Sequence, residues 1–111
     1  MASKEALVIY ITEQMGHQGH IKYKKMFGEY AIYYDDKVVA LICDDRLYLK
    51  PTVAGRTFIG DVTEAAPYPN AKPCFVIEDQ IEDQSWLAAL VRITADALPA
   101  MKPRKSKQKY I

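Results

Sequence analysis

The sequence lacks long apolar stretches, and this absence excludes an ordinary membrane-spanning helix. Such a helix needs roughly 20 consecutive apolar residues, whereas the apolar run Val38–Cys43 is bounded by charged residues on both sides. The first residues, MASKEALVIYITEQ, place an acid directly after Lys4 and offer no small-residue cleavage site, so they predict no secretory signal. We therefore expect a cytoplasmic protein that does not enter a membrane.

Cysteine and glycine are also scarce. The chain has two cysteines, Cys43 and Cys74, and without a predicted signal they indicate reduced thiols rather than a disulfide scaffold. Its five glycines form no glycine-rich loop of the kind that binds phosphate. With 111 residues, 50% of them hydrophobic and 26% charged, the chain fits one globular domain.

Positive charge is concentrated near the C-terminus. The chain carries 15 basic and 14 acidic residues, and the basic residues of the last part are Lys102, Arg104, Lys105, Lys107 and Lys109. Removing these from the 15 leaves 10 basic residues against 14 acidic ones, a net charge of −4. An acidic body is repelled by phosphate backbones. Because the basic residues are concentrated at this end, we divide the chain into one domain, residues 1–100, and a basic tail, residues 101–111.

The first half of the chain predicts one helix followed by a β-meander. Leu7, Ile11 and Met15 recur at helical spacing after Ser3, a good N-cap residue, which predicts a helix over 3–16. From residue 21 the period becomes two, and acidic turns at 35–36 and 44–45 separate short strands up to residue 50. Connections this short force neighbouring strands to run antiparallel. The strand 38–43 is apolar on both faces and should be covered on both.

The second half predicts two further helices and one or two more strands. Residues 52–60 fit a short helix or an irregular crossover. The prolines of residues 65–73 indicate a loop, and residues 74–77 fit a strand. Capping residues around Asp83 and an apolar stripe from Trp86 to Leu98 predict a final helix that Pro99 ends. Helices packed on an antiparallel sheet make a two-layer α+β fold.

Residues 26–50, MFGEYAIYYDDKVVALICDDRLYLK, resemble the signature of the TfoX/Sxy N-terminal domain family. The matching pieces are a Met-Phe-Gly turn, a tyrosine-rich strand, an acidic turn, an apolar strand and a Leu-Tyr-Leu-Lys strand. The resemblance extends over residues 5–98. It implies a secretion-chaperone-like arrangement of helix, strands, helix, strands and helix. It also implies a link to the regulation of natural competence in bacteria, here with a stand-alone N-terminal domain.

Few residues suggest catalysis or metal binding. His17 and His20 form one close pair, but zinc usually takes two such pairs, and Cys43 lies in the most apolar part of the chain, where an inert thiol is expected. The aspartate pairs at 35–36 and 44–45 fit turns, because aspartate bonds its own backbone there. We therefore expect a protein that is not an enzyme and has no catalytic residue, metal or cofactor.

Tyrosine is the feature that suggests a function. The tyrosines of the meander alternate, so that Tyr30 and Tyr34 should share one face of the sheet and Tyr33 should lie on the other. Three interpretations are open: the rings complete the core, they form a protein interface, or they stack on nucleic-acid bases. The candidate interaction surface comprises Phe27, Gly28, Tyr30, Tyr33 and Tyr48.

The leading hypothesis is a non-catalytic regulatory or protein-interaction domain that self-associates, as a dimer, through part of its sheet. The first alternative is a nucleic-acid-associated protein, in which Lys22, Lys24, Lys25 and the basic tail (Lys102, Arg104, Lys105, Lys107 and Lys109) contact phosphates. The second alternative is a small-molecule pocket between helix and sheet.

Overall fold

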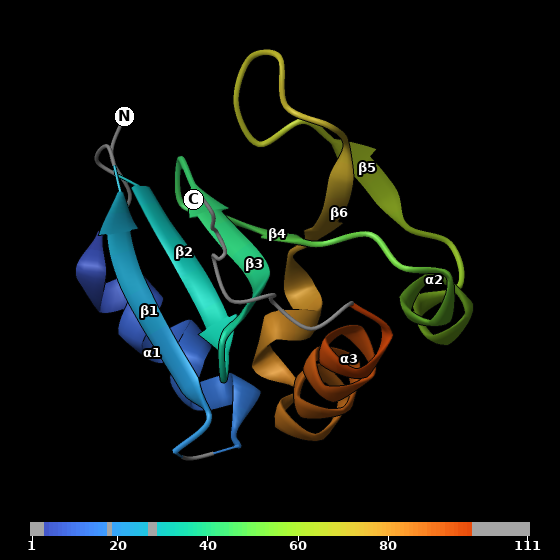
Figure 1. Cartoon of the computed structure of the whole chain (residues 1–111), viewed down its shortest axis with the longest axis horizontal. Coiled ribbons are helices and arrows are strands. Elements are labelled where there is room, and N and C mark those ends of the chain that lie inside the picture. Colours follow the sequence, from blue (N-terminus) through green and yellow to red (C-terminus); the bar gives the residue numbers. More distant parts are fainter. Residues whose placement is uncertain (1–3, 18, 27–28, 99–111) are drawn as a thin grey trace, which may run out of the picture.

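The computed structural model describes residues 4–17, 19–26 and 29–98. In chain order the elements are α1 (Glu5–Met15), β1 (Ile21–Met26), β2 (Glu29–Tyr34), β3 (Lys37–Cys43), β4 (Arg46–Leu49), α2 (Val53–Ile59), β5 (Thr63–Ala65), β6 (Cys74–Ile77), the 3₁₀-helix η1 (Asp79–Glu82) and α3 (Gln84–Ala97). The strands form one six-stranded antiparallel sheet in the order β1-β2-β3-β4-β6-β5 (Figure 1). The predicted α+β class and the order of helices and strands are confirmed. The boundary predicted at residue 100 lies outside the described residues.

The helix α1 has the periodicity that the sequence predicts. It buries Val8, Ile11 and Met15 against the sheet, and Gly16 follows with φ of 67°, a conformation that glycine adopts without strain. Ser3, the predicted N-cap, lies outside the described residues, and Lys4 occupies the N-cap position without a side-chain hydrogen bond.

The meander β1–β4 is also as predicted. Tyr30 pairs with Ile42, and Leu41 pairs with Tyr48, in antiparallel register. The turns after β2 and β3 contain Asp35 and Asp44, whose φ values of 55° and 53° lie in the left-handed region that aspartate tolerates better than most residues. The register shifts between Ile32 and Tyr33, which pair with Ala40 and Val38, so Val39 is the extra residue of a β-bulge in β3.

The segment between β4 and β6 contains a helix and a strand whose position the sequence did not indicate. Thr52 is the N-cap of the helix α2, and its hydroxyl accepts a hydrogen bond from the Gly55 amide at 2.9 Å. This resolves the predicted choice between helix and irregular crossover in favour of a helix. Strand β5 pairs with β6 at the edge of the sheet, and its three residues are too few to show an alternating pattern in the sequence.

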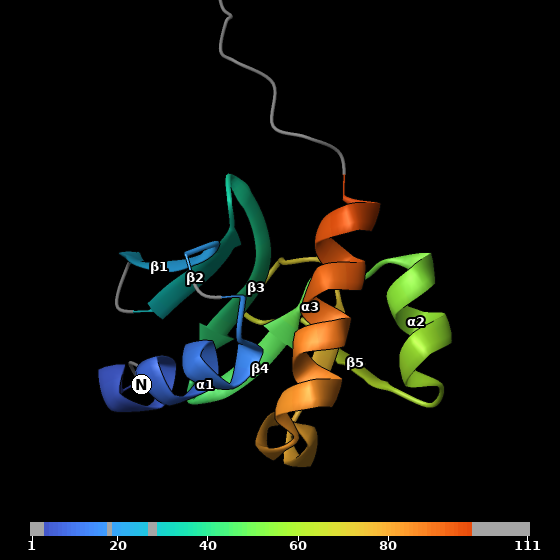
Figure 2. The same ribbon diagram turned by 90° about the horizontal axis from the view of Figure 1, so that it is seen from below.

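The final helix α3 has its predicted cap. The carboxylate of Asp83 accepts a hydrogen bond from the Trp86 amide at 3.1 Å, and Leu87, Leu90 and Val91 are buried. Both α1 and α3 lie on one side of the sheet, while α2 packs beside α3 (Figure 2). Pro99, the predicted end of this helix, falls outside the described residues.

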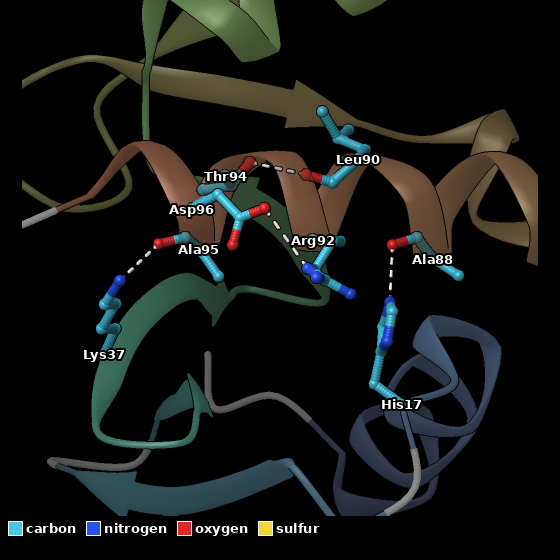
Figure 3. A network of polar contacts seen from close by, with 8 residues as sticks. All are labelled: His17, Lys37, Ala88, Leu90, Arg92, Thr94, Ala95 and Asp96. Carbon is cyan, nitrogen blue, oxygen red and sulfur yellow. Dashed lines mark hydrogen bonds and ion pairs between the residues drawn. The ribbon is translucent and has the colours of Figure 1, made fainter.

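Two side chains from other parts of the fold bind the backbone of α3 (Figure 3). His17 Nε2, between α1 and β1, donates to the Ala88 carbonyl at 2.8 Å, and Lys37 Nζ, at the start of β3, donates to the Ala95 carbonyl at 2.7 Å. Within the helix, the buried Thr94 hydroxyl donates to the Leu90 carbonyl. The first half of α3 is thus joined to the connection between α1 and β1, and its last turn to the start of β3.

Among the described residues, no helix combines the length and apolar character that crossing a bilayer requires.

Candidate interaction surface

The two faces of the sheet have different partners. On one face, which we call the helix face, Tyr30, Ile32, Ile42, Leu47 and Leu49 pack with the three helices in the main core. On the other face, which we call the outer face, a separate cluster consists of Cys43, Tyr48 and Cys74 with Leu41, Ala65 and Val76 against them. All members of this second cluster lie on strands, so no described helix covers the outer face.

The outer face is hollowed where the loop between β5 and β6 passes over it. One hollow, of about 460 Å³, has mainly apolar lining from Met26, Glu29, Tyr30, Leu41, Cys43, Pro67 and Tyr68. A second, of about 360 Å³, shares Leu41, Pro67 and Tyr68 with the first and continues to Lys50, Lys72 and Cys74. We call the two together the outer groove. The large apolar side chains Met26 and Tyr68 at its rim are 40% and 56% exposed.

The structure separates the tyrosines that the sequence grouped together. Tyr30 lies on the helix face and Tyr48 on the outer face, and each is only 6% exposed. Burial of both rings favours the interpretation that these two tyrosines complete the packing. Tyr33 is half-buried on the outer face, opposite Lys22. Phe27 and Gly28, the other members of the predicted surface, lie outside the described residues.

The predicted phosphate-binding lysines are likewise divided between the faces. Ile21 and Tyr23 of β1 pack against the main core, so the alternation of side chains places Lys22 and Lys24 on the outer face and Lys25 on the helix face. All three side chains are exposed. The tail residues Lys102, Arg104, Lys105, Lys107 and Lys109 lie outside the described residues.

The predicted site residues did not include several residues of the groove, namely Leu41, Lys50, Pro67, Tyr68 and Lys72. The cluster of prolines around Tyr68 did indicate an extended loop. No local pattern, however, indicates that this loop lies beside Leu41, because that contact depends on how β6 pairs with β4.

Both cysteines are free and buried on the outer face. Burial raises the pKa of the Cys43 thiol to about 11, with smaller contributions from Glu29 and Cys74. Burial also raises the pKa of Cys74, although nearby Lys50 opposes the shift. A thiol that stays protonated at neutral pH is a poor nucleophile and a poor metal ligand.

The two histidines serve the packing of the meander. The ring of Tyr34 stacks on His20 at 5.5 Å between centroids and meets His17 edge-on at 5.2 Å. His20 Nδ1 lies 2.8 Å from a carboxylate oxygen of Asp35, and His17 binds the Ala88 carbonyl. The described part of the chain has no cluster of three or more His, Cys, Asp or Glu side chains that could hold a metal ion.

A third hollow lies on the opposite side of the molecule. It is wide open, measures about 760 Å³ and is lined by Tyr10, Gln14, Asp79, Glu82, Asp83, Gln84 and Ser85, around the start of α3. Its charged side chains are all carboxylates, in contrast to the lysines of the outer groove.

The sequence is similar to a known protein family and to one curated relative. Residues 13–98 match the TfoX N-terminal domain. The chain is also 44% identical over 109 residues to a Spirochaeta aurantia protein described as an uncharacterized 12.7 kDa protein in the trpE 5′ region. That match covers 98% of this chain and 95% of the relative. Since the domain match spans most of the chain, this protein belongs to the TfoX N-terminal domain family.

Proposed function

We propose that this protein is a non-catalytic regulatory domain of the cytoplasm that acts by binding another protein on the outer face of its sheet. The observation that carries the proposal is the outer groove, an apolar hollow over strands that no described helix covers. An antiparallel sheet can leave one face to solvent, but that face is then usually polar. A concave apolar surface with exposed rim residues is instead typical of a binding site.

The distribution of reactive side chains supports binding rather than catalysis. Burial raises the pKa of both cysteine thiols above an ordinary value that already favours the protonated form at neutral pH. His17 and His20 already bind Ala88 and Asp35. Catalytic sites need a nucleophile, a base and a charge-stabilising group within reach of one substrate. The outer groove offers thiols with a raised pKa and apolar side chains instead, with Glu29, Lys50 and Lys72 as its charged lining residues.

Self-association is proposed through the same face rather than through the edge of the sheet. The edge strand β1 carries Lys22, Lys24 and Lys25, and such charged edges oppose the addition of another strand. A second copy that paired with β1 would bring lysines against lysines. A dimer, where it forms, therefore uses the outer groove.

The test compares two variants with matched exposure. Met26 lies at the groove and Ile9 lies on α1, and their exposed fractions are 40% and 41%. The full-length wild type, Met26→Glu and Ile9→Glu are immobilised and incubated with a native lysate, and light scattering at micromolar concentration measures self-association. We expect proteins retained by the wild type and by Ile9→Glu to be lost with Met26→Glu.

Three outcomes would contradict the proposed function. One is a monomeric wild type that retains no protein, and the second is an identical set of retained proteins for all three forms. The third is a turnover abolished by replacing one cysteine or histidine. Circular dichroism of both variants shows that a loss of binding does not result from unfolding.

A further inference from the structure

The described residues around the outer groove carry more positive than negative charge, although the carboxylate of Glu29 also lines it. Lys50 and Lys72 line it directly, and Lys24 lies in the same row of side chains as Leu41, because Lys24 pairs with Ala31 and Ala31 pairs with Leu41. Lys22 follows on β1, and Arg46 on β4 lies on the same face as Tyr48. Within the described residues, no ion pair joins any of these cations to a carboxylate.

This charge runs against the overall balance of the domain. Without its tail the chain has a net charge of −4 by composition, yet the outer face is mainly basic. Glu29 is a carboxylate of the groove itself, whereas Asp79, Glu82 and Asp83 gather elsewhere, around the hollow at the start of α3. Segregation of charge between opposite faces gives each face a preferred partner, because complementary potentials steer association and reject like charge.

Resting on the proposed function, we propose that the outer groove binds an extended acidic segment of a partner protein. One aliphatic or aromatic side chain of that segment fills the hollow at Leu41 and Tyr68, and its carboxylates lie against Lys24, Lys50 and Lys72. The hollow of about 460 Å³ falls within the usual range for small binding pockets, roughly 300–1,000 Å³. Its apolar lining provides the anchor, and the lysines provide the preference for acidic sequences.

Two other occupants fit the groove less well. Single-stranded nucleic acid would use the same lysines but needs exposed aromatic rings on which bases stack, and Tyr30 and Tyr48 are buried, which leaves Tyr68 as the strongly exposed aromatic ring of the groove. A second copy packed outer face to outer face, as in the dimer proposed above, would bring Lys50 and Lys72 of both copies together, so we expect this dimer to be weaker than the complex with an acidic segment. An acidic segment meets neither obstacle.

The experiment selects peptides without assuming a sequence. Random linear peptides displayed on phage are selected on the full-length wild type after depletion on Met26→Glu, and the enriched peptides are then synthesised. We expect sequences with one large apolar residue flanked by Asp or Glu. Enriched sequences that are basic or neutral, or no enrichment at all, would overturn the proposal.

The lysines are tested by charge reversal with a matched control on the same strand. Lys24→Glu and Lys72→Glu should each weaken binding of the selected peptide about threefold to tenfold, as expected for an exposed ion pair turned into a repulsion. Lys25→Glu changes the net charge equally but lies on the helix face, so its affinity should stay within about twofold of the wild type. An equal loss for Lys24→Glu and Lys25→Glu would contradict the proposed contacts.

A single-stranded oligothymidylate serves as the competing probe. The proposal is overturned if this oligonucleotide displaces the peptide and its own binding depends on Lys24 and Lys72. Failure of the inference is distinguishable from failure of the proposed function. If lysate proteins are still lost with Met26→Glu while selection yields no acidic peptide, the groove binds a protein of different chemistry. If both experiments fail, the groove is not a protein-binding surface.

Discussion

Lys24 and Lys25 are consecutive in the chain but lie on opposite faces of β1. Lys24 pairs with Ala31 on the outer face, whereas Lys25 pairs with Tyr30, whose ring belongs to the main core. The charge of Lys24 therefore lies on the face of the outer groove, whereas the charge of the next residue, Lys25, lies on the opposite face. Reversing either lysine changes the net charge of the protein equally, so the pair distinguishes a local contact from a general electrostatic effect.

The cap of α2 leads to a prediction about Gly55. A Cβ at this buried glycine would lie 2.7 Å from the Thr52 hydroxyl, the group that accepts the Gly55 amide hydrogen bond. Gly55→Ala should therefore displace the cap and lower the unfolding free energy by about 1 kcal/mol. The higher helix propensity of alanine offsets part of this loss. Urea denaturation measures the change.

The double variant provides the control for this prediction. In the background of Thr52→Ala the cap is already lost, so Gly55→Ala has nothing to displace and should stabilise by up to about 1 kcal/mol. Phe75 and Leu90, at 3.6 and 3.7 Å from the same Cβ, are at ordinary contact distance. If Gly55→Ala destabilises equally in both backgrounds, the clash involves groups other than the cap.

The cap of α3 should be as important for stability. Asp83→Ala removes the acceptor of the Trp86 amide at 3.1 Å and should cost about 1 kcal/mol of unfolding free energy. Asp83→Asn keeps an oxygen acceptor and should lose only a fraction of this. Equal urea midpoints for the wild type and Asp83→Ala would show that the cap contributes nothing.

The thiol of Cys43 predicts a loss of stability at high pH. Its pKa is about 11 in the folded protein, above the ordinary value of 9.0, because the side chain is buried. Between pH 9 and pH 11 the unfolded chain releases this proton while the folded protein retains it, so the unfolding free energy falls as the pH rises. Below pH 9 the thiol is protonated in both the folded and the unfolded state, so its ionisation does not lower the unfolding free energy there.

Comparison with Cys43→Ala isolates the thiol from the lysines and tyrosines that titrate in the same range. The urea midpoint of the variant should fall less between pH 9 and pH 11 than that of the wild type. Alkylation of Cys43 by iodoacetamide near neutral pH should also be much slower in the folded protein than in denaturant. Identical pH profiles for both proteins would mean that Cys43 ionises freely in the folded state.

Much of the fold could be predicted from the sequence because it is encoded locally. The aspartates at 35–36 and 44–45 mark the turns of the meander, and Asp83 marks the start of α3. The position of strand β5 could not be predicted because its three residues are too few to show an alternating pattern of apolar and polar side chains. The strand 38–43 was expected to be covered on both faces, and it is only partly so: Ile42 packs in the main core, whereas Leu41 is half-buried at the groove.

The candidate site was harder to predict because it depends on contacts between distant segments. Alternation correctly placed Tyr30 and Tyr33 on different faces, but it does not indicate which face the helices cover, and Tyr30 lies on the covered one. The groove forms where Pro67 and Tyr68 reach Leu41. The sequence identified these residues as belonging to a loop and a strand, and only the pairing of β6 with β4 brings them together.

The most direct test of the central claim is to map the binding site of the selected acidic peptide by amide chemical shifts of the full-length protein. We expect the shift changes to be concentrated at Leu41, Lys50, Tyr68 and Lys72, with Ile9 and the rest of α1 unaffected. Changes centred on α1 or on the acidic hollow at Asp79 and Glu82, with the outer groove unperturbed, would contradict the claim that the outer face is the binding surface.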